Sequence, residues 1–302
     1  MTLHRSASNG QHPGVSVSCP ACSHHSLRVA VQLNGYNIWR CHECHSLTTS
    51  PLPTSDVLGG YYSGYAQRYK GGMRKRRYDV EMPKRFQAKL QMLQRRAPPD
   101  GALLDLGSAD GMFARIAREC GFKVTTGDFV PESVETPLGL VVAIDLDTPG
   151  GVPFPDSSFD IVTLFSCIEH VRRPASALGE IHRLLRPGGF LGLDTPAVGD
   201  WCERNYRGRS HWICPPEHLH LFSKEGLSSL LATCGFRVVY HAQSFERTRL
   251  RYLARKGRNY AVAASGWALR KINRRKWESL LQTADCSAGD IQFVIAVRPT
   301  QA

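Results

Sequence analysis

The feature that most constrains the fold is a regular alternation of strand-like and helix-like segments from residue 101 onward. Short apolar runs stand at 102–106, 122–128, 140–147, 159–166, 190–196, 236–242 and 291–297, and segments of helical periodicity separate several of them. Strands that alternate with helices form a parallel or mostly parallel sheet with helices on both faces. The sequence therefore predicts an α/β chain with a Rossmann-like, doubly wound, seven-stranded sheet.

The segments between the runs carry helix signals. In 111–120, Phe113, Ile116, Ala117 and Cys120 share one helical face, and Gly121 is a typical C-terminal stop. Further helices are expected over 175–185 and 224–234, the second with Ser223 as its N-cap.

One more helix is expected before the first strand of the sheet. Met82, Phe86, Leu90 and Leu93 recur at helical spacing, with Pro83 tolerated in the first turn. The resulting layout is a disordered tail (1–15), a metal-binding module (16–50), a linker and helix (51–100), and a large domain (101–302) with a basic helical insertion at about 246–286.

The charge of the chain indicates which partners it can bind. The formal net charge is +12 at pH 7, and lysine and arginine are dense in the 246–286 insertion. This favours a polyanion such as RNA, a phosphorylated small molecule or an anionic membrane surface, unless the charge serves solubility alone. No apolar run approaches the roughly 20 residues that span a bilayer, and 1–14 lack a secretory apolar stretch, so a cytoplasmic location is expected.

The strongest local motif is the stretch LLDLGSADG (103–111). Gly107 and Gly111 allow a sharp turn between strand and helix and a close approach of the backbone to a ligand. Ala109 and Asp110 break the dinucleotide fingerprint, so a nicotinamide dehydrogenase is the least favoured reading. Asp128 ends the second strand, where a carboxylate can accept hydrogen bonds from ribose hydroxyls.

Four segments together resemble class I S-adenosylmethionine-dependent methyltransferases: DLGSADG, DFVPESV, VPFPDSSFDIVTLFSCIEHV and LRPGGFLGLDTP. The resemblance implies that the glycine turn binds the amino-acid part of the cofactor, that Asp128 binds its ribose, and that Asp145, after the third strand, faces its adenine. Ala109 departs from the glycine usual in the family. The implied cofactor site comprises Asp105, Gly107, Ser108, Gly111, Asp128 and Asp145.

The cysteines of the N-terminal region have zinc-ribbon spacing. Cys19 and Cys22 form one CxxC pair, and Cys41 and Cys44 form a second. Four thiolates make a closed tetrahedral zinc site, which is structural because no coordination position remains open. The nearby histidines at 24, 25, 42 and 45 could replace a ligand, and the six scattered cysteines are expected to be free thiols rather than a disulfide framework.

The same region extends the resemblance. CPAC, NGYNIWRCHEC, SPLPT and GGYYSGY in succession are similar to the zinc-binding N-terminal part of a bacterial methyltransferase branch that includes deoxysugar C-methyltransferases. Those enzymes carry a sizeable extra C-terminal domain, for which this chain has too few residues.

The candidate base lies in the segment HWICPPEHLHLF (211–222). Glu217 and His218 match the Glu-His pair that abstracts a proton in the sugar enzymes, and a neighbouring carboxylate can orient an imidazole and raise its basicity. The alternative is that the pair only organises the loop. His220 is a weaker candidate, and Glu169-His170 is interpreted as structural or cofactor-side. Tyrosines 61, 62 and 65 either close over the substrate or pack on the domain.

The sequence thus predicts an S-adenosylmethionine-dependent enzyme that methylates a small-molecule biosynthetic intermediate with a sugar-like or other polar acceptor. An RNA methyltransferase is the alternative, since a zinc module and a basic surface also suit RNA. A non-enzymatic adaptor that retains the fold is the third.

Overall fold

The computed structural model describes residues 18–62, 72–129, 141–198, 212–243 and 291–300, with the helical backbone alone for 72–78. The expected tail and the basic insertion lie outside these residues, as do Tyr65, Cys202 and Cys286. Within the described part of the chain, no helix is long and apolar enough to cross a membrane.

A seven-stranded sheet forms the centre of the molecule, in the order β10-β11-β8-β7-β4-β5-β6. The strands β4 to β8 run parallel, whereas β11 is antiparallel to both β8 and β10. Their bounds are β4 Ala102–Leu106, β5 Lys123–Asp128, β6 Val142–Ala143, β7 Phe159–Phe165, β8 Leu185–Pro196, β10 Arg237–Gln243 and β11 Ile291–Val297. The predicted Rossmann-like sheet is confirmed.

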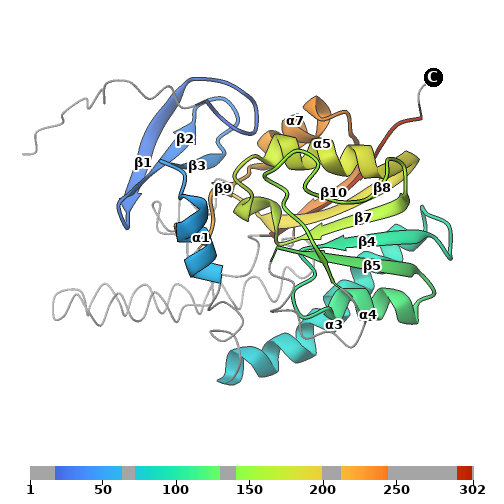
Figure 1. Ribbon diagram of the computed structural model, residues 1–302. Helices are drawn as coiled ribbons and strands as arrows, with labels where there is room; N and C mark the ends of the chain where they lie inside the picture. The colour runs from blue at the N-terminus through green and yellow to red at the C-terminus, as the bar shows by residue number, and fades with distance from the viewer. Residues whose placement is uncertain (1–17, 63–71, 130–140, 199–211, 244–290, 301–302) are drawn as a thin grey trace, which may run out of the picture.

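Helices cover the two faces of this sheet (Figure 1). On one face α3 (Gly72–Gln94) and α4 (Met112–Glu119) bury Phe86, Leu90, Leu93, Phe113 and Ile116. On the other face α5 (Pro174–Leu184) and α7 (Lys224–Thr233) bury a second apolar set. The oxygen of Ser223 accepts from Gly226 N at 2.9 Å, which confirms the predicted N-cap.

Three local expectations are wrong. Pro83 lies inside α3, because the helix begins at Gly72, and the missing proline N–H costs one interior hydrogen bond. The third strand is only Val142–Ala143, since the chain turns at Asp145. Cys120 is exposed because α4 ends at Glu119, so its side chain does not join the buried face.

A second, smaller sheet stands at the N-terminal side, in the order β1-β2-β3-β9. β1 (Leu27–Leu33) and β2 (Tyr36–Cys41) form a hairpin through Asn34 and Gly35, whose φ angles of 52° and 82° suit a tight turn of that kind. β3 (Leu47–Ser50) pairs with β9 (His220–Leu221), which comes from the loop after β8. The smaller sheet is therefore completed by the segment that holds the candidate base.

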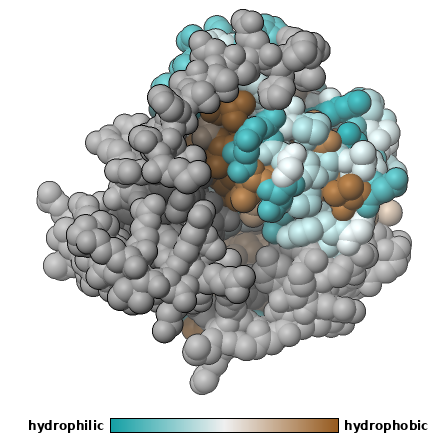
Figure 2. Space-filling view, turned by 90° about the vertical axis from the view of Figure 1, so that its left-hand side faces the viewer, coloured by the Kyte–Doolittle hydropathy of each residue, from teal (hydrophilic) through white to brown (hydrophobic). Residues whose placement is uncertain are grey.

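The two parts share one core. Cys19, Cys41 and Cys44 belong to the same buried cluster as Phe222 and Leu227. Ser223 donates a hydrogen bond to the carbonyl of Cys44, and its backbone N–H donates to Ser46 Oγ at 3.1 Å. Among the described residues, those that Figure 2 shows on this side are mostly hydrophilic, with apolar residues gathered along the border of the coloured surface.

Candidate functional site

The candidate site lies at the edge of the sheet where the parallel strands end. In open α/β sheets ligands bind outside the carboxyl ends of the strands, where loops and helix N-termini meet. Here β4, β5, β7 and β8 end at Leu106, Asp128, Phe165 and Pro196, and the short helix η2 (Ile168–His170) follows β7. Of the predicted cofactor residues, those at 105–111 and 128 meet at this edge.

The turn after β4 has the strained backbone that the glycines predicted. Gly107 and Gly111 have φ angles of 71° and 69°, and Ala109 between them has a φ of 47°. A Cβ on Gly107 would lie 3.1 Å from Cys167 Sγ, a tight contact, so the positive φ angle and the close packing both favour glycine there. A non-glycine residue in this region is uncommon, and such strain is found at ligand sites.

Acidic side chains lie on both sides of the turn. Asp128 accepts a hydrogen bond from Ala109 N at 3.0 Å, which fixes its carboxylate against the turn. Asp105 is buried and accepts from Thr163 Oγ1 at 2.7 Å. Burial raises the pKa of Asp105 to about 7, because its charged form loses solvation.

The turn also holds a polar atom without a protein partner. Ser108 is 6% exposed, and its Oγ makes no hydrogen bond to any described residue. Buried hydroxyls are normally paired, and the exceptions require an explanation such as a bound molecule. The N-terminus of α4 lies beside this turn. The turn therefore fits an anionic or polar ligand group, such as the carboxylate of S-adenosylmethionine.

Asp145 has a local role. Its Oδ1 accepts from Asp147 N at 2.9 Å, and its Oδ2 accepts from Thr148 Oγ1 at 2.7 Å. Both oxygens therefore close the turn that follows β6. Contact with adenine stays a prediction.

The four N-terminal cysteines converge on one point. Cys19 Sγ lies 3.5 Å from Cys44 Sγ, Cys22 Sγ lies 3.6 Å from Cys41 Sγ, and all four sulfurs are within 4.8 Å of one another. Four thiolates around a tetrahedral zinc at about 2.3 Å stand at comparable separations. The hydrogen bond from Cys19 lowers the pKa of Cys44 to about 4, so one thiolate is already favoured. The donor set fits zinc.

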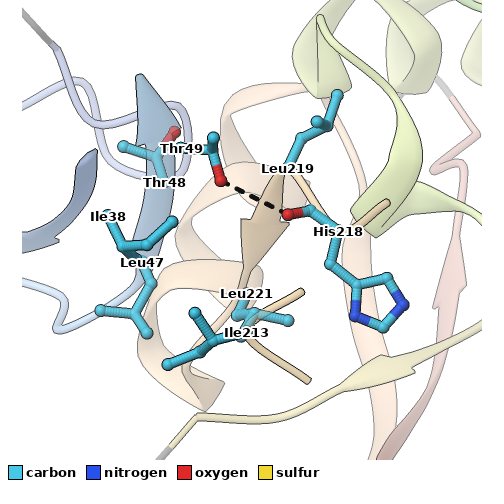
Figure 3. Close-up of a pocket in the computed structure, with 8 residues that line it drawn as sticks. All are labelled: Ile38, Leu47, Thr48, Thr49, Ile213, His218, Leu219 and Leu221. Carbon is cyan, nitrogen blue, oxygen red and sulfur yellow. Dashed lines mark hydrogen bonds between the residues drawn. The ribbon is translucent and has the colours of Figure 1, made fainter. Parts of the chain in front are cut away.

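The loop with the candidate base is clamped by the smaller sheet. Thr48 Oγ1 lies 2.9 Å from His220 Nδ1. Thr49 Oγ1 donates to the carbonyl of His218 at 3.4 Å, as Figure 3 shows. Asn34 adds a bond to the carbonyl of Pro215 at 3.1 Å. His220 is thereby buried in a structural contact with β3.

The backbone orients the imidazole of His218. Its Nδ1 lies 2.8 Å from the carbonyl oxygen of Trp212, and because a carbonyl only accepts, Nδ1 carries the proton. The neutral ring then has its lone pair on Nε2. Burial lowers the pKa of His218, which keeps the ring neutral. A neutral imidazole with a fixed tautomer has the form of a general base.

Glu217 differs from the expected orienting carboxylate. Its Oε2 accepts a hydrogen bond from Tyr61 Oη at 2.5 Å, while its backbone carbonyl accepts from His170 Nδ1 at 2.9 Å. His218 Nδ1 instead contacts the Trp212 carbonyl and, at 3.4 Å, Cys214 Sγ. The loop backbone thus does what the neighbouring carboxylate was expected to do.

Glu169 and His170 lie against His218 rather than apart from it. The rings of His170 and His218 are 4.8 Å apart, and Tyr62 Oη lies 2.9 Å from His170 Nδ1. Glu169 is 1% exposed and accepts from Thr195 Oγ1 at 2.9 Å. The two Glu-His pairs, far apart in sequence, form one cluster.

Other polar residues at this edge were not predicted from the sequence. Thr195 and Asp194 end β8; Asp194 accepts from Ser166 N at 2.6 Å and pairs with Lys89, whose Nζ lies 4.6 Å from the centre of the Phe165 ring. Their position in the sequence could have identified them, because polar residues at the ends of adjacent parallel strands lie at the same edge of a sheet.

Curated relatives match parts of the chain. The 2-methyl-6-phytyl-1,4-hydroquinone methyltransferase of Synechocystis sp. is 33% identical over 116 residues, which are 36% of this chain and 35% of that protein. The demethylmenaquinone methyltransferase of Thermus thermophilus is 28% identical over 173 residues, 47% of this chain and 77% of that protein. This chain spans only 35–40% of the length of the first relatives.

Solved structures share the fold. The 1,6-didemethyltoxoflavin-N1-methyltransferase of Burkholderia thailandensis superposes with a TM-score of 0.52 at 17% identity, covering 89% of this chain and 97% of that one. The cyclase SpnF gives 0.52 at 18% identity, covering 83% and 98%. Because one of these proteins is named as a cyclase, the shared fold alone does not show methyl transfer.

The family follows from a longer match. The model of the methyltransferase domain family matches residues 78–241, more than half of the chain, and this range includes the glycine turn, Asp128 and the His170–His218 cluster. The chain therefore belongs to the methyltransferase family, with residues 78–241 as its methyltransferase domain.

Proposed function

We propose that the protein transfers a methyl group from S-adenosylmethionine to a small-molecule biosynthetic intermediate with a sugar-like or other polar acceptor. The turn after β4 carries this proposal, since it leaves the buried Ser108 hydroxyl without a partner beside Asp128 and the N-terminus of α4. Bound S-adenosylmethionine supplies an electrophilic methyl group. The protein has to hold the acceptor in line with it and manage one proton.

The cofactor residues divide the work by charge and shape. Gly107, Ser108 and Gly111 offer backbone and hydroxyl groups for the amino-acid end, and Asp128 offers its carboxylate to the ribose. Asp105 stands behind the turn, where its ionised form would favour a cationic ligand. Asp145 would face the adenine.

His218 is the proposed base, with Nε2 as the proton-accepting atom. Its Nδ1 is tied to the Trp212 carbonyl, and the ring is kept neutral by burial. Glu217 positions the loop through its bonds with Tyr61 and His170. Methyl transfer to a hydroxyl, a carbon acid or a protonated amine needs such a base.

The names of the curated relatives favour a small acceptor over RNA. They include methyltransferases of a phytyl hydroquinone, of a malonyl group on acyl carrier protein and of demethylmenaquinone. The net charge of +12 favours the RNA alternative. Binding of an RNA fragment that weakens steeply with salt, together with methylation of RNA from labelled cofactor, would replace the small-molecule proposal.

The decisive experiment is calorimetry of the full chain with S-adenosylmethionine and S-adenosylhomocysteine. We expect saturable binding of both compounds, weakened by Asp128→Asn. Absence of binding by folded protein at millimolar ligand would refute the enzymatic proposal and leave a non-enzymatic adaptor.

We also propose that Cys19, Cys22, Cys41 and Cys44 hold a structural zinc ion. Because β9 completes the smaller sheet, this ion would support the position of the Glu217–His218 loop. Metal analysis should find one sulfur-bound zinc per chain, lost in Cys44→Ser. In that variant proteolysis should cleave the loop near β9 faster, whereas an uncut loop would separate the zinc from the site.

A further inference from the structure

The cluster formed by the two Glu-His pairs has an arrangement that proton abstraction alone does not require. One ligand atom each from Glu169, His170 and His218 lies within 4.8 Å of the other two, and His170 Nε2 is 3.9 Å from Glu169 Oε1. All three side chains are largely or fully withdrawn from solvent. They come from η2 and from the loop before β9, two segments joined by the bond from Leu219 N to the carbonyl of Glu169 at 2.8 Å.

The two imidazoles are oriented in the same way. His170 donates Nδ1–H to the carbonyl of Glu217 at 2.9 Å, and His218 donates Nδ1–H to the carbonyl of Trp212 at 2.8 Å. Each neutral ring therefore has its lone pair on Nε2. Metal-binding histidines generally have this outer bond, which fixes the tautomer and aims the other nitrogen at the ion.

The carboxyl group also has an outer bond and lacks a cation. Thr195 Oγ1 donates to Glu169 Oε2 at 2.9 Å, so Oε1 is the oxygen that faces His170. Among the side chains that the structure describes, no lysine or arginine forms an ion pair with Glu169. A divalent cation would supply the missing positive charge.

We propose that Glu169, His170 and His218 form a binding site for a divalent transition-metal ion, separate from the four-cysteine cluster. Two imidazoles and one carboxylate suit zinc, iron(II) or cobalt(II), and three protein ligands leave coordination positions open. Ligands at about 2.0–2.2 Å from one ion stand roughly 3.0–3.5 Å apart, so the side chains close by about 1 Å on binding.

The open positions would take an oxygen or nitrogen atom of the methyl acceptor. That use rests on the proposed function, whereas the metal site itself does not. An ion at this place makes His218 Nε2 a ligand, so the base role and the metal role of His218 exclude each other. Dependence of the methylation rate on added metal would decide between them.

The test is a cobalt(II) titration of the full chain after the cysteine cluster has been loaded with zinc. We expect a second equivalent of bound metal, with visible d–d absorption and no thiolate charge-transfer band. Glu169→Gln should remove this equivalent while the protein stays folded, because glutamine has the shape of the neutral acid. Thr195→Val, which removes only the outer bond, should weaken the binding by roughly 10–100-fold.

Glu225→Gln is the matched control, since it makes the same chemical change on an exposed glutamate of α7 and should leave the second equivalent intact. A single equivalent of metal in the wild type, or unchanged binding in Glu169→Gln, would overturn the proposal. S-adenosylmethionine binding, measured by calorimetry in the same samples, reports separately on the proposed function.

Discussion

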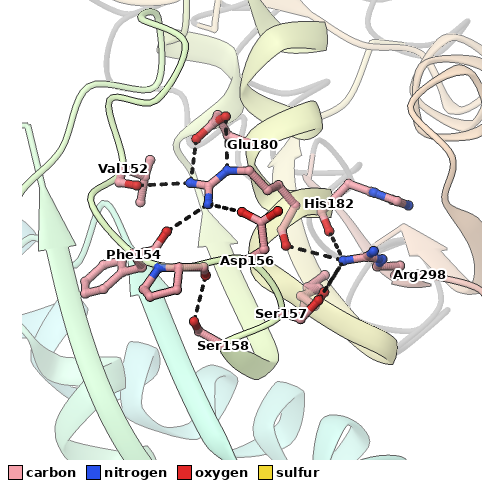
Figure 4. A network of polar contacts seen from close by, with 11 residues as sticks. Val152, Phe154, Asp156, Ser157, Ser158, Glu180, His182 and Arg298 are labelled. Atoms are coloured by element: carbon pink, nitrogen blue, oxygen red, sulfur yellow. Dashed lines mark hydrogen bonds and ion pairs between the residues drawn. The ribbon is translucent and has the colours of Figure 1, made fainter.

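The two edges of the seven-stranded sheet treat their polar groups in opposite ways. At the edge where the parallel strands begin, the polar groups pair with one another. Arg298 Nη1 donates to Ser157 Oγ and to the carbonyls of His182, Arg183 and Leu185, while the guanidinium of Arg183 pairs with Glu180 and Asp156 (Figure 4). Asp160 likewise joins Arg186 and Ala102 N.

At the edge where the strands end, the pairing is incomplete. Ser108 Oγ is buried without a described partner, Ala109 has a positive φ angle, and burial raises the pKa values of Asp105 and Glu169 to about 7 and about 8. Such features cost free energy in the folded chain, and they persist where a ligand compensates for them.

The residues of the two edges therefore have different roles. Residues of the first edge should contribute to the stability of the chain and little to ligand binding, and those of the second edge should do the reverse. Substitutions at matched positions of the two edges test this difference.

The largest effect is expected for His218→Gln at the second edge. If Nε2 accepts the proton, the rate constant of methyl transfer should fall by about 10²–10⁴-fold. The affinity for S-adenosylmethionine should stay unchanged, because the turn after β4, rather than His218, is proposed to bind it. Single-turnover rates with labelled cofactor, without added divalent metal, measure the effect.

Glu217→Gln is the comparison variant, and it should lose less, since the Glu217 carboxylate bonds to Tyr61 rather than to the imidazole. Equal losses in both variants would mean that the pair acts as one unit, contrary to the geometry.

Arg298→Ala tests the first edge. Its loss removes a buried donor from the carbonyls of His182 and Leu185, while the Arg183 carbonyl keeps its bond from Ser157 N at 2.9 Å. We expect the free energy of unfolding to fall by about 2–4 kcal/mol. Urea denaturation measures this. The dissociation constant for S-adenosylmethionine should change less than about twofold, and a large change would show that the edges are coupled.

The sequence was sufficient for the sheet because hydrophobic periodicity is a local property. Every strand of the sheet could be located from the sequence, and so could the N-cap at Ser223, although β8 begins at Leu185 rather than at 190. The length of α3 could not be predicted, since tertiary packing overrides Pro83 as a helix breaker. The length of β6 was overestimated because the apolar residues 144 and 146 are buried beyond the end of the strand at Ala143.

The candidate site was predictable in its parts and not in its assembly. Glycines, acids and Glu-His pairs stand out as motifs, but nothing local shows that His170 contacts His218, or that β9 pairs with β3. These are contacts between distant segments. The tautomer of His218 depends on its bond to the Trp212 carbonyl. Every residue has a backbone carbonyl, so the sequence does not indicate which one bonds to the imidazole.

Asp128→Asn should weaken binding of S-adenosylmethionine by roughly 10–100-fold, because hydrogen bonds to a charged acceptor contribute about 1.5–3 kcal/mol. The stability of the chain should hardly change, since an amide oxygen can still accept from Ala109 N. Calorimetry measures the affinity. Asp156→Asn, the same change at the first edge, should leave the affinity as it is.

Asp105→Asn tests the buried acid through pH. The folded pKa is about 7 and the unfolded value about 3.9, so between these the folded wild type binds more protons. Its free energy of unfolding should therefore fall as pH rises through this window, by up to about 1.4 kcal/mol per pH unit from this group. The variant lacks this contribution, so its stability relative to wild type should rise with pH.

The ionisation of Asp105 should also change the affinity for S-adenosylmethionine. As Asp105 ionises above pH 7, the wild type should bind the cationic cofactor more tightly, and the variant should not. Denaturation and calorimetry from pH 5 to 8 measure both effects. If the free energy of unfolding and the affinity changed with pH in the same way in both proteins, Asp105 would be ionised throughout this range. Burial at the second edge would then not raise its pKa.

The smallest effect, and the sharpest contrast, is expected from Ser108→Ala. Removing a buried hydroxyl that has no described partner should leave the free energy of unfolding unchanged or raise it by up to about 1 kcal/mol. Loss of its bond to the cofactor should weaken binding by about 2–10-fold, the worth of a neutral hydrogen bond of roughly 0.5–1.5 kcal/mol. Thr163→Val removes a hydroxyl that is paired, with Asp105 at 2.7 Å, and should cost stability instead. If Ser108→Ala destabilised the chain as Thr163→Val does, the Ser108 hydroxyl would have a structural partner, and this edge would be saturated like the other.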